Sequence, residues 1–305
     1  MSNITVAALY KFADFPNFKE HRESIKAVCQ DNKILGTLLL AHEGINGTIA
    51  GPDAGVDALI AHLRSIPQFK ELEYKKSYAD DYPFYRLKVR LKKEIVTLGI
   101  DGLNPGSETG HFVAPKDWNE LISSPDVILI DTRNDYEVKV GTFKGAINPK
   151  TESFREFSDY VLDNPELFKN RRIAMFCTGG IRCEKASAFM MHHGYDDVYQ
   201  LHGGILKYLE EVPQDESLWE GECFVFDNRV SVMDGVEPGH FDLCHGCRAP
   251  MTDEAKASVH YEAGVSCPEC YDKKSEKKLK ALRERQKQIA LARSRNQRHL
   301  GVRPS

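Results

Sequence analysis

Residues 171–195, RRIAMFCTGGIRCEKASAFMMHHGY, decide the fold of the centre of the chain. A short apolar run, residues 173–176, ends at Cys177 and leads into two glycines. From Cys183 onward, good helix formers and apolar residues recur at helical spacing. A buried strand that passes through a glycine turn into a helix is typical of parallel sheets, whose sites lie beyond the strand carboxyl ends. We therefore expect residues 177–183 to form a site.

The same alternation extends to both sides of this segment. Residues 125–133, PDVILIDTR, predict a buried strand, as do residues 197–204, DVYQLHGG. Residues 204–212, GILKYLEEV, predict a helix. Because buried strands alternate with helices, we predict a parallel-sheet α/β domain over residues 115–215.

Residues 1–108 follow a different pattern, with elements in the order β-α-β-β-α-β that is typical of a ferredoxin-like α+β domain. A turn is expected at residues 44–47, between the second and third strands. The Gly-, Pro- and Ser-rich stretch at residues 99–112 predicts a linker. The predicted strands are residues 4–12, 36–43, 48–51, 71–79 and 85–96, and the predicted helices are residues 17–32 and 56–66.

Composition places the chain among ordinary globular proteins, with 305 residues, 28% charged and 41% hydrophobic. It has no run of about 18 apolar residues, so we expect no membrane span. The first residues, MSNITVAALYKF, resemble a strand and not a signal peptide, which predicts a cytoplasmic protein. The isolated Cys29 and Cys223 are expected to be small buried hydrophobic residues.

Four of the eight cysteines lie close together within residues 216–272. Cys244, Cys247, Cys267 and Cys270 form a C-x2-C-x19-C-x2-C pattern. Such spacing predicts a tetrahedral zinc site, and a closed set of four thiolates predicts a structural ion and not a catalytic one. Two structural disulfides are the alternative.

The end of the chain is strongly basic. Residues 273–305 hold 12 Lys and Arg against Glu276 and Glu284, so this tail carries +10 and the rest of the chain −14. A basic helical tail on an acidic body predicts an anionic partner, and phosphate contacts with RNA fit it. A merely solvated helix is the alternative.

The loop after the central strand favours thiolate chemistry. Backbone N–H groups of a glycine turn and of a helix N-terminus converge on Cys177 and would lower its pKa. Since the thiolate is the nucleophile, we predict Cys177 as the catalytic thiol, with Arg182 supplying positive charge. Cys183 falls in the first helical turn, where Ser or Thr would serve as a cap. The other predicted loop residues are Thr178, Gly179, Gly180 and Ile181.

Other interpretations of this loop stay open. A disulfide between Cys177 and Cys183 is possible on spacing, although a reducing cytosol opposes it. A loop that only binds an anion is another. Cysteine phosphatases place five residues between Cys and Arg, whereas four separate Cys177 from Arg182, which leaves few donors for a phosphate.

Three motifs together resemble the rhodanese (persulfide sulfurtransferase) family. They are DTRNDYEVKVGTFKGAIN at residues 131–148, CTGGIRC at residues 177–183 and LHGGILKY at residues 201–208. The resemblance implies a site with Cys177, Asp131 and Arg133, and a terminal Gly203-Gly204 pair. Thr142 stands where that family usually has His.

Over most of its length the chain resembles the oxygen-dependent tRNA uridine hydroxylase family. AHEGINGTIAG at residues 41–51 and CTGGIRCEKAS at residues 177–187 carry this resemblance, together with the Cys-rich C-terminal region. It implies 5-hydroxylation of the wobble uridine, with tRNA as partner and molecular oxygen as co-substrate. A sulfurtransferase acting on tRNA or a protein, and a non-catalytic RNA-binding scaffold, are the alternatives. The electron donor and the oligomeric state are not indicated.

The HEGING segment, residues 42–47, has two interpretations. It is a turn whose glycines supply positive φ. Alternatively, the polar side chains of His42, Glu43 and Asn46 contact the Cys177 loop or a flipped base.

Overall fold

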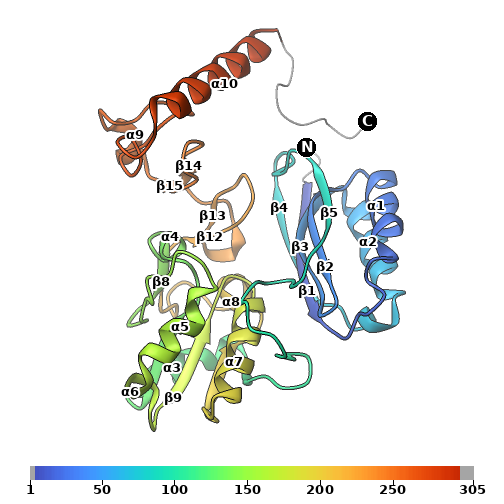
Figure 1. Ribbon diagram of the computed structural model, residues 1–305, viewed down its shortest axis with the longest axis vertical. Coiled ribbons are helices and arrows are strands. Elements are labelled where there is room, and N and C mark those ends of the chain that lie inside the picture. The colour runs from blue at the N-terminus through green and yellow to red at the C-terminus, as the bar shows by residue number, and fades with distance from the viewer. Residues whose placement is uncertain (1–3, 296–305) are drawn as a thin grey trace.

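The computed structural model describes residues 4–295. Its N-terminal part is a mixed five-stranded sheet with helices on one face (Figure 1). The sheet order is β4-β1-β3-β2-β5, and β5 runs parallel to β2 at the edge. The first four strands and two helices keep the ferredoxin-like order, which confirms the α+β prediction. The elements are β1 (Ile4–Phe12), α1 (His21–Asp31), β2 (Leu35–Ala41), β3 (Gly44–Gly51), α2 (Asp53–Arg64), η1 (Pro67–Phe69), β4 (Tyr74–Ala79) and β5 (Leu87–Leu91).

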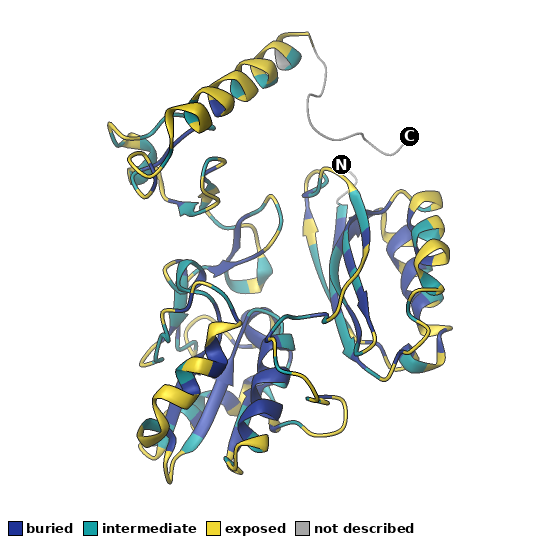
Figure 2. Cartoon of the chain, in the orientation of Figure 1, coloured by how far each residue is buried: buried dark blue, intermediate teal, exposed yellow. Residues whose placement is uncertain are grey.

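The alternation of β1 determines which face of this sheet is covered. Ala7 and Leu9 join the core under the two helices, whereas Ala8 and Tyr10 point to the opposite face. Figure 2 shows the inner sides of α1 and α2 buried against the sheet. The helix-free face is therefore available to the other domain.

The turn between β2 and β3 differs from the prediction. It lies at His42–Glu43, and the expected turn residues Gly44 to Gly47 belong to strand β3. Gly44 has φ of +132°, and a Cβ on Gly47 would lie 2.1 Å from the carbonyl oxygen of Thr37. These glycines are therefore needed because neighbouring strands approach their backbone closely, and not because the chain reverses there.

The second part is a four-stranded parallel sheet, in the order β6-β10-β9-β7, which confirms the predicted α/β class. Cys177 follows β9, and Asp131 ends β7 beside it, so both lie at the carboxyl edge. The elements are β6 (His111–Val113), α3 (Pro115–Ile122), β7 (Val127–Asp131), α4 (Asp135–Val138), β8 (Gly141–Phe143), α5 (Glu156–Asp163), α6 (Pro165–Phe168), β9 (Arg172–Phe176), α7 (Ile181–His192), β10 (Val198–Leu201) and α8 (Gly204–Glu211).

The third part is made of short hairpins and one long helix. β11 pairs with β8, and Trp219 packs on Phe143, so the start of this part completes the parallel-sheet domain. α10 is mostly exposed, but Leu282 is buried and Arg283 binds Glu262 (Figure 2). The elements are β11 (Trp219–Gly221), β12 (Cys223–Phe224), β13 (Ser231–Val232), η2 (Asp234–Val236), β14 (Asp242–Leu243), β15 (Pro250–Met251), α9 (Asp253–Ala257) and α10 (Glu276–Ser294).

Residues 296–305 of the predicted basic tail lie outside the described residues. Within residues 4–295, no helix combines the length and the apolar character that a membrane crossing requires.

Candidate active site

The Cys177 loop is held from two sides. The Sγ of Cys177 accepts a hydrogen bond of 3.2 Å from the backbone N–H of Gly180, whose φ of +104° starts helix α7. The carbonyl oxygen of Cys177 accepts the N–H of Ile205 at 3.0 Å, at the start of α8. A Cβ on Gly204 would lie 2.5 Å from that oxygen, which explains the need for glycine as the first residue of α8.

The electrostatics of the loop favour a thiolate at Cys177. Burial by itself raises the pKa of Cys177, but it is outweighed by a hydrogen bond from the Cys183 side chain, the charge of Arg182, and the backbone N–H groups of Cys183 and Gly180. The pKa of Cys177 is therefore lowered. Burial and the neighbouring Cys177 raise the pKa of Cys183, which stays protonated and donates to the thiolate.

The predicted capping role of Cys183 is wrong. The N-cap of α7 is Gly180, and Cys183 lies three residues inside the helix, fully buried, with its Sγ 3.5 Å from the Oγ1 of Thr132. Cys177 and Cys183 are both free thiols, so the structure contains no disulfide between them.

Arg182 is fixed by a carboxylate that sequence reasoning missed. Its two guanidinium nitrogens donate to the carboxylate of Glu137 at 2.7 and 2.8 Å, and both side chains are buried. Burial opposes the charged form of Glu137, but Arg182 lowers the pKa of Glu137 overall. The signal was present in the sequence as a capping box, in which Asn134 and Glu137 start α4.

Asp131 and Arg133 lie behind the loop and not in the cavity. The Arg133 guanidinium binds the Asp131 carboxylate at 2.6 and 2.9 Å, and both side chains are fully buried. Thr142 donates to the Asp131 Oδ2 at 2.9 Å, so the residue that replaces the usual His still bonds to this carboxylate. Neither side chain lines the space before Cys177, which favours a positioning role for this predicted pair.

A cavity of about 310 Å³ lies in front of the Cys177 loop, between the two domains. The helix-free face of the N-terminal sheet forms one wall through Val6, Ala8, Tyr10, Asn46, Thr48, Lys75 and Ser77. The loop forms the opposite wall through Cys177, Thr178, Gly179, Ile181 and Arg182, and a third wall comes from Val225, Phe226, Asp227, Arg229 and Val236. The site is thus shared by all three parts of the chain.

Lys75 brings a second cation to the loop from the other domain. Its Nζ donates to the carbonyl oxygen of Gly179 at 3.0 Å and lies 5.5 Å from the ring centroid of Tyr10. Burial lowers the pKa of Lys75, although the nearby Cys177 opposes this effect. Sequence reasoning missed Lys75, and its only signal was a polar residue on the helix-free face of a predicted strand.

The structure separates the three polar residues of HEGING. Asn46 lines the cavity and donates to the carbonyl oxygen of Ile95 at 2.8 Å. Glu43 faces the second domain, where it binds Lys185. His42 is 67% exposed beside Asp14, away from the cavity. Of these three residues, only Asn46 lines the cavity, so the hypothesis of contact with the loop or a base is kept for Asn46 alone.

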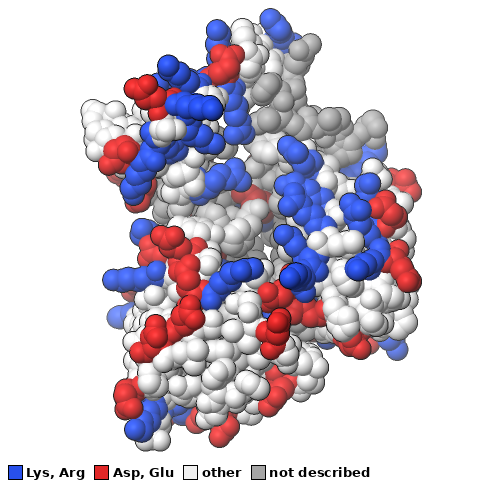
Figure 3. All heavy atoms as spheres, in the orientation of Figure 1, with Lys and Arg blue, Asp and Glu red and all other residues white. Residues whose placement is uncertain are grey.

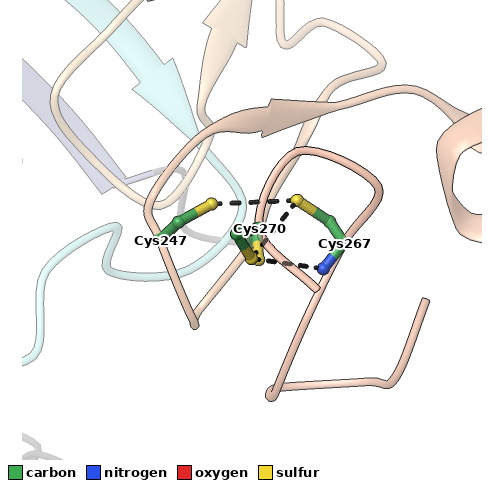
Figure 4. Close-up of side chains that lie close together, drawn as sticks. Cys247, Cys267 and Cys270 are labelled. Atoms are coloured by element: carbon green, nitrogen blue, oxygen red, sulfur yellow. Dashed lines mark hydrogen bonds between the residues drawn. The ribbon is translucent and has the colours of Figure 1, made fainter. Parts of the chain in front are cut away.

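The four C-terminal cysteines converge. Cys244 and Cys270 have sulfurs 3.9 Å apart, Cys247 and Cys267 3.7 Å, and Cys267 and Cys270 3.8 Å; Figure 4 shows Cys247, Cys267 and Cys270 turned toward one another. A tetrahedron with metal–sulfur distances of about 2.3 Å has edges of about 3.8 Å. The four sulfurs lie within 4.8 Å of one another and form no disulfide in the structure, so this cluster fits one metal ion.

This fold and site define a rhodanese-type cysteine protein whose cavity is closed by an N-terminal α+β domain. The family profile "UPF0176 acylphosphatase like domain" matches residues 4–95, and "Rhodanese-like domain" matches residues 114–211. A solved rhodanese-like domain protein from Staphylococcus aureus is 25% identical, with a TM-score of 0.27, and covers 32% of this chain and 90% of its own.

Curated relatives extend over nearly the whole chain. The tRNA uridine(34) hydroxylase of Agrobacterium fabrum is 59% identical over 97% of this chain and 94% of its own length. That of Rhizobium etli is 58% identical over 97% of this chain and 96% of its own. The chain belongs to the tRNA uridine(34) hydroxylase family. It is therefore an enzyme, which sets aside the non-catalytic scaffold.

Proposed function

We propose that this enzyme hydroxylates uridine 34 of tRNA at C5, with molecular oxygen as co-substrate and Cys177 as the essential thiol, in the cytoplasm. The observation that carries the proposal is the cavity of about 310 Å³ that places the Cys177 thiolate opposite a wall from another domain. Its volume lies in the range of small-ligand pockets, about 300–1,000 Å³, and suits one base extruded from the RNA.

We assign a separate role to each polar residue of the cavity. Cys177 presents a thiolate to the bound base, while Arg182 and the loop N–H groups stabilise its negative charge. Lys75 holds the loop by its Gly179 carbonyl. Asn46 and Thr48 present polar groups to the base from β3. Cys177 is 1% exposed, so little water reaches the thiolate.

The overall reaction balances with one reductant. One oxygen atom of O2 replaces the C5 hydrogen as a hydroxyl group, and the other leaves as water. Two electrons and two protons are required, and we assign them to an external dithiol reductant, which is oxidised to its disulfide.

Zinc is the proposed ion of the four-cysteine cluster. Cys244, Cys247, Cys267 and Cys270 would complete its tetrahedral coordination and leave no open position, so it would stabilise residues 242–295 without entering the reaction. Lys274, at the start of the basic tail, already donates to the Cys270 carbonyl oxygen at 3.3 Å. The tail would add phosphate contacts to RNA.

A second candidate is persulfide sulfur transfer to tRNA or to a protein. It is favoured by the bond from Gly180 N–H to the Cys177 sulfur, because such N–H groups would also stabilise a persulfide anion. With tRNA as the acceptor, the two functions predict different products at the same nucleotide; with a protein acceptor, sulfur transfer predicts no change in the tRNA.

The deciding experiment is nucleoside mass spectrometry of tRNA incubated with the enzyme and a dithiol under ¹⁸O2. Incorporation of ¹⁸O into 5-hydroxyuridine at position 34 supports hydroxylation, and a thiolated nucleoside instead supports sulfur transfer. Cys177→Ser should abolish the product, whereas Cys29→Ser, at a buried site in α1, should retain it.

A further inference from the structure

A second and larger hollow, of about 1010 Å³, adjoins the catalytic cavity. It lies between the β5 edge of the N-terminal sheet and the four-cysteine segment. Both spaces share Val225, Phe226 and Asp227 as lining residues, so they meet at this point. We call the larger space the basic groove.

Lys and Arg outnumber acidic residues in the lining of the groove. Its lining has two acidic residues, Asp227 and Glu269, and Asp227 is already paired with Arg229 at 2.7 Å. In Figure 3, Lys and Arg gather over α10 and over the facing edge of the N-terminal domain, on the two sides of a hollow. The cations lining it are Arg86, Lys88, Arg90, Arg248, Lys273, Lys274 and Arg285.

One face of one sheet forms the floor of both spaces. In the pairing register, Lys75 is opposite Ala8, Ala8 opposite Thr48, Thr48 opposite Thr37, and Thr37 opposite Lys88. This cross-strand row starts at the Gly179 carbonyl of the active loop and ends in the groove. A ligand lying along the row would reach Cys177 from the groove without leaving the sheet.

Phe226 stands where the two spaces meet. It is 61% exposed, unusual for an aromatic ring on a fixed segment, and Arg182 lies 6.0 Å from its ring centroid. The residues that follow Phe226 are tied to the N-terminal domain. Arg229 donates to the Ser77 hydroxyl at 2.8 Å, and the N–H of Asn228 donates to the Pro83 carbonyl at 3.0 Å. The exposed ring is therefore held in place at the cavity mouth.

We propose that the basic groove binds the phosphodiester backbone of RNA beside the modified nucleotide, and that Phe226 stacks on a base at the cavity mouth. This rests on the proposed function and adds the route by which the substrate enters. Phosphates are the anions that a groove with seven Lys and Arg would recognise. Stacking on an exposed aromatic ring is the usual way proteins hold splayed RNA bases.

The test measures binding of a tRNA transcript with uridine at position 34 to the full-length protein, as a function of salt. Log affinity falls as log salt rises, and each phosphate contact contributes about 0.7–0.9 to the steepness of that fall. The triple variant Arg86→Gln, Lys88→Gln, Arg90→Gln should therefore make the fall less steep by about 2–3. Phe226→Ala should weaken binding roughly ten- to a hundredfold, and Phe226→Tyr should restore it.

Matched controls keep the test sharp. The triple variant Lys116→Gln, Lys144→Gln, Lys169→Gln removes the same charge from exposed positions outside the groove and should leave the slope unchanged. Urea unfolding of each variant establishes that it is folded.

An unchanged slope and affinity in the groove variants would overturn the proposal and leave an acidic protein as the occupant of the groove. Absence of ¹⁸O product from the wild-type enzyme, with tRNA binding intact, would instead reject the proposed function.

Discussion

The Nζ of Lys185 lies 2.8 Å from the Oε2 of Glu43, although the two residues belong to different domains. Lys185 is 1% exposed, and its Nζ also binds Glu94 at 2.6 Å and the Val96 carbonyl at 3.0 Å. Because Lys185 lies in α7, directly after the Cys177 loop, this cluster fixes the loop against the sheet that faces it.

Replacing Lys185 with Met should therefore destabilise the protein. Removing one partner of a buried ion pair leaves its carboxylates uncompensated, which costs about 3–5 kcal/mol when both are fully buried. Glu43 and Glu94 are 19% exposed, so we expect about 2–4 kcal/mol in urea unfolding. Lys169→Met, which breaks an exposed pair with Glu166, should cost at most about 0.5 kcal/mol. Equal effects of the two variants would contradict the role of the cluster.

Alkylation of Cys177 should persist at acid pH. The rate follows the thiolate fraction, so it falls only as pH drops through the pKa of Cys177, which lies below its ordinary value. Arg182→Gln removes a cause of that lowering and should move the fall to higher pH. The pH profile of iodoacetamide labelling, read by mass spectrometry at the Cys177 peptide, measures both. A profile that falls near pH 9 in the wild type would disprove the thiolate.

The carboxyl group of Glu184 should make stability depend on pH near neutrality. Burial raises its pKa to about 7, against a hydrogen bond from Tyr10 and the charges of Lys11 and Lys75 that lower it. Since its folded pKa exceeds the unfolded value, stability should decline as pH rises from about 4.5 to about 7.

Glu184→Gln should remove this decline. We expect the variant to be more stable than wild type by about 1–2 kcal/mol at pH 8, after discounting for partial exposure, and little different at pH 4.5. Glu166→Gln, at an exposed position in α6, is the matched control. A difference that does not change with pH would exclude this linkage.

Metal removal should loosen the C-terminal part first. We expect one zinc per chain by plasma mass spectrometry, and loss of it in Cys267→Ser. Chelation should expose residues 242–295 to proteolysis, while residues 115–232 stay protected because their core is separate from the cluster. Full zinc content in Cys267→Ser would contradict the four-cysteine site.

The sequence by itself determined the local features of this enzyme. The order of strands and helices in residues 4–91, the thiol at a strand end before two glycines, and the paired C-x2-C motifs all depend on neighbouring residues, and all follow the predicted pattern. The elements β6, β8 and α3 to α6 were not predicted. The β2–β3 turn was predicted at residues 44–47 but lies at residues 42–43, because glycine occurs at close backbone approaches as well as in turns.

Tertiary structure decided which groups share the cavity. Glu137, Lys75 and Phe226 reach Arg182, Gly179 and the cavity mouth from elements far away in the chain. No periodicity records such contacts, since a polar residue on a strand has the same pattern whether it faces water or another domain. The pairing of Lys185 with Glu43 has the same origin: the free energy of burying those charges depends on a partner that only the folded chain supplies.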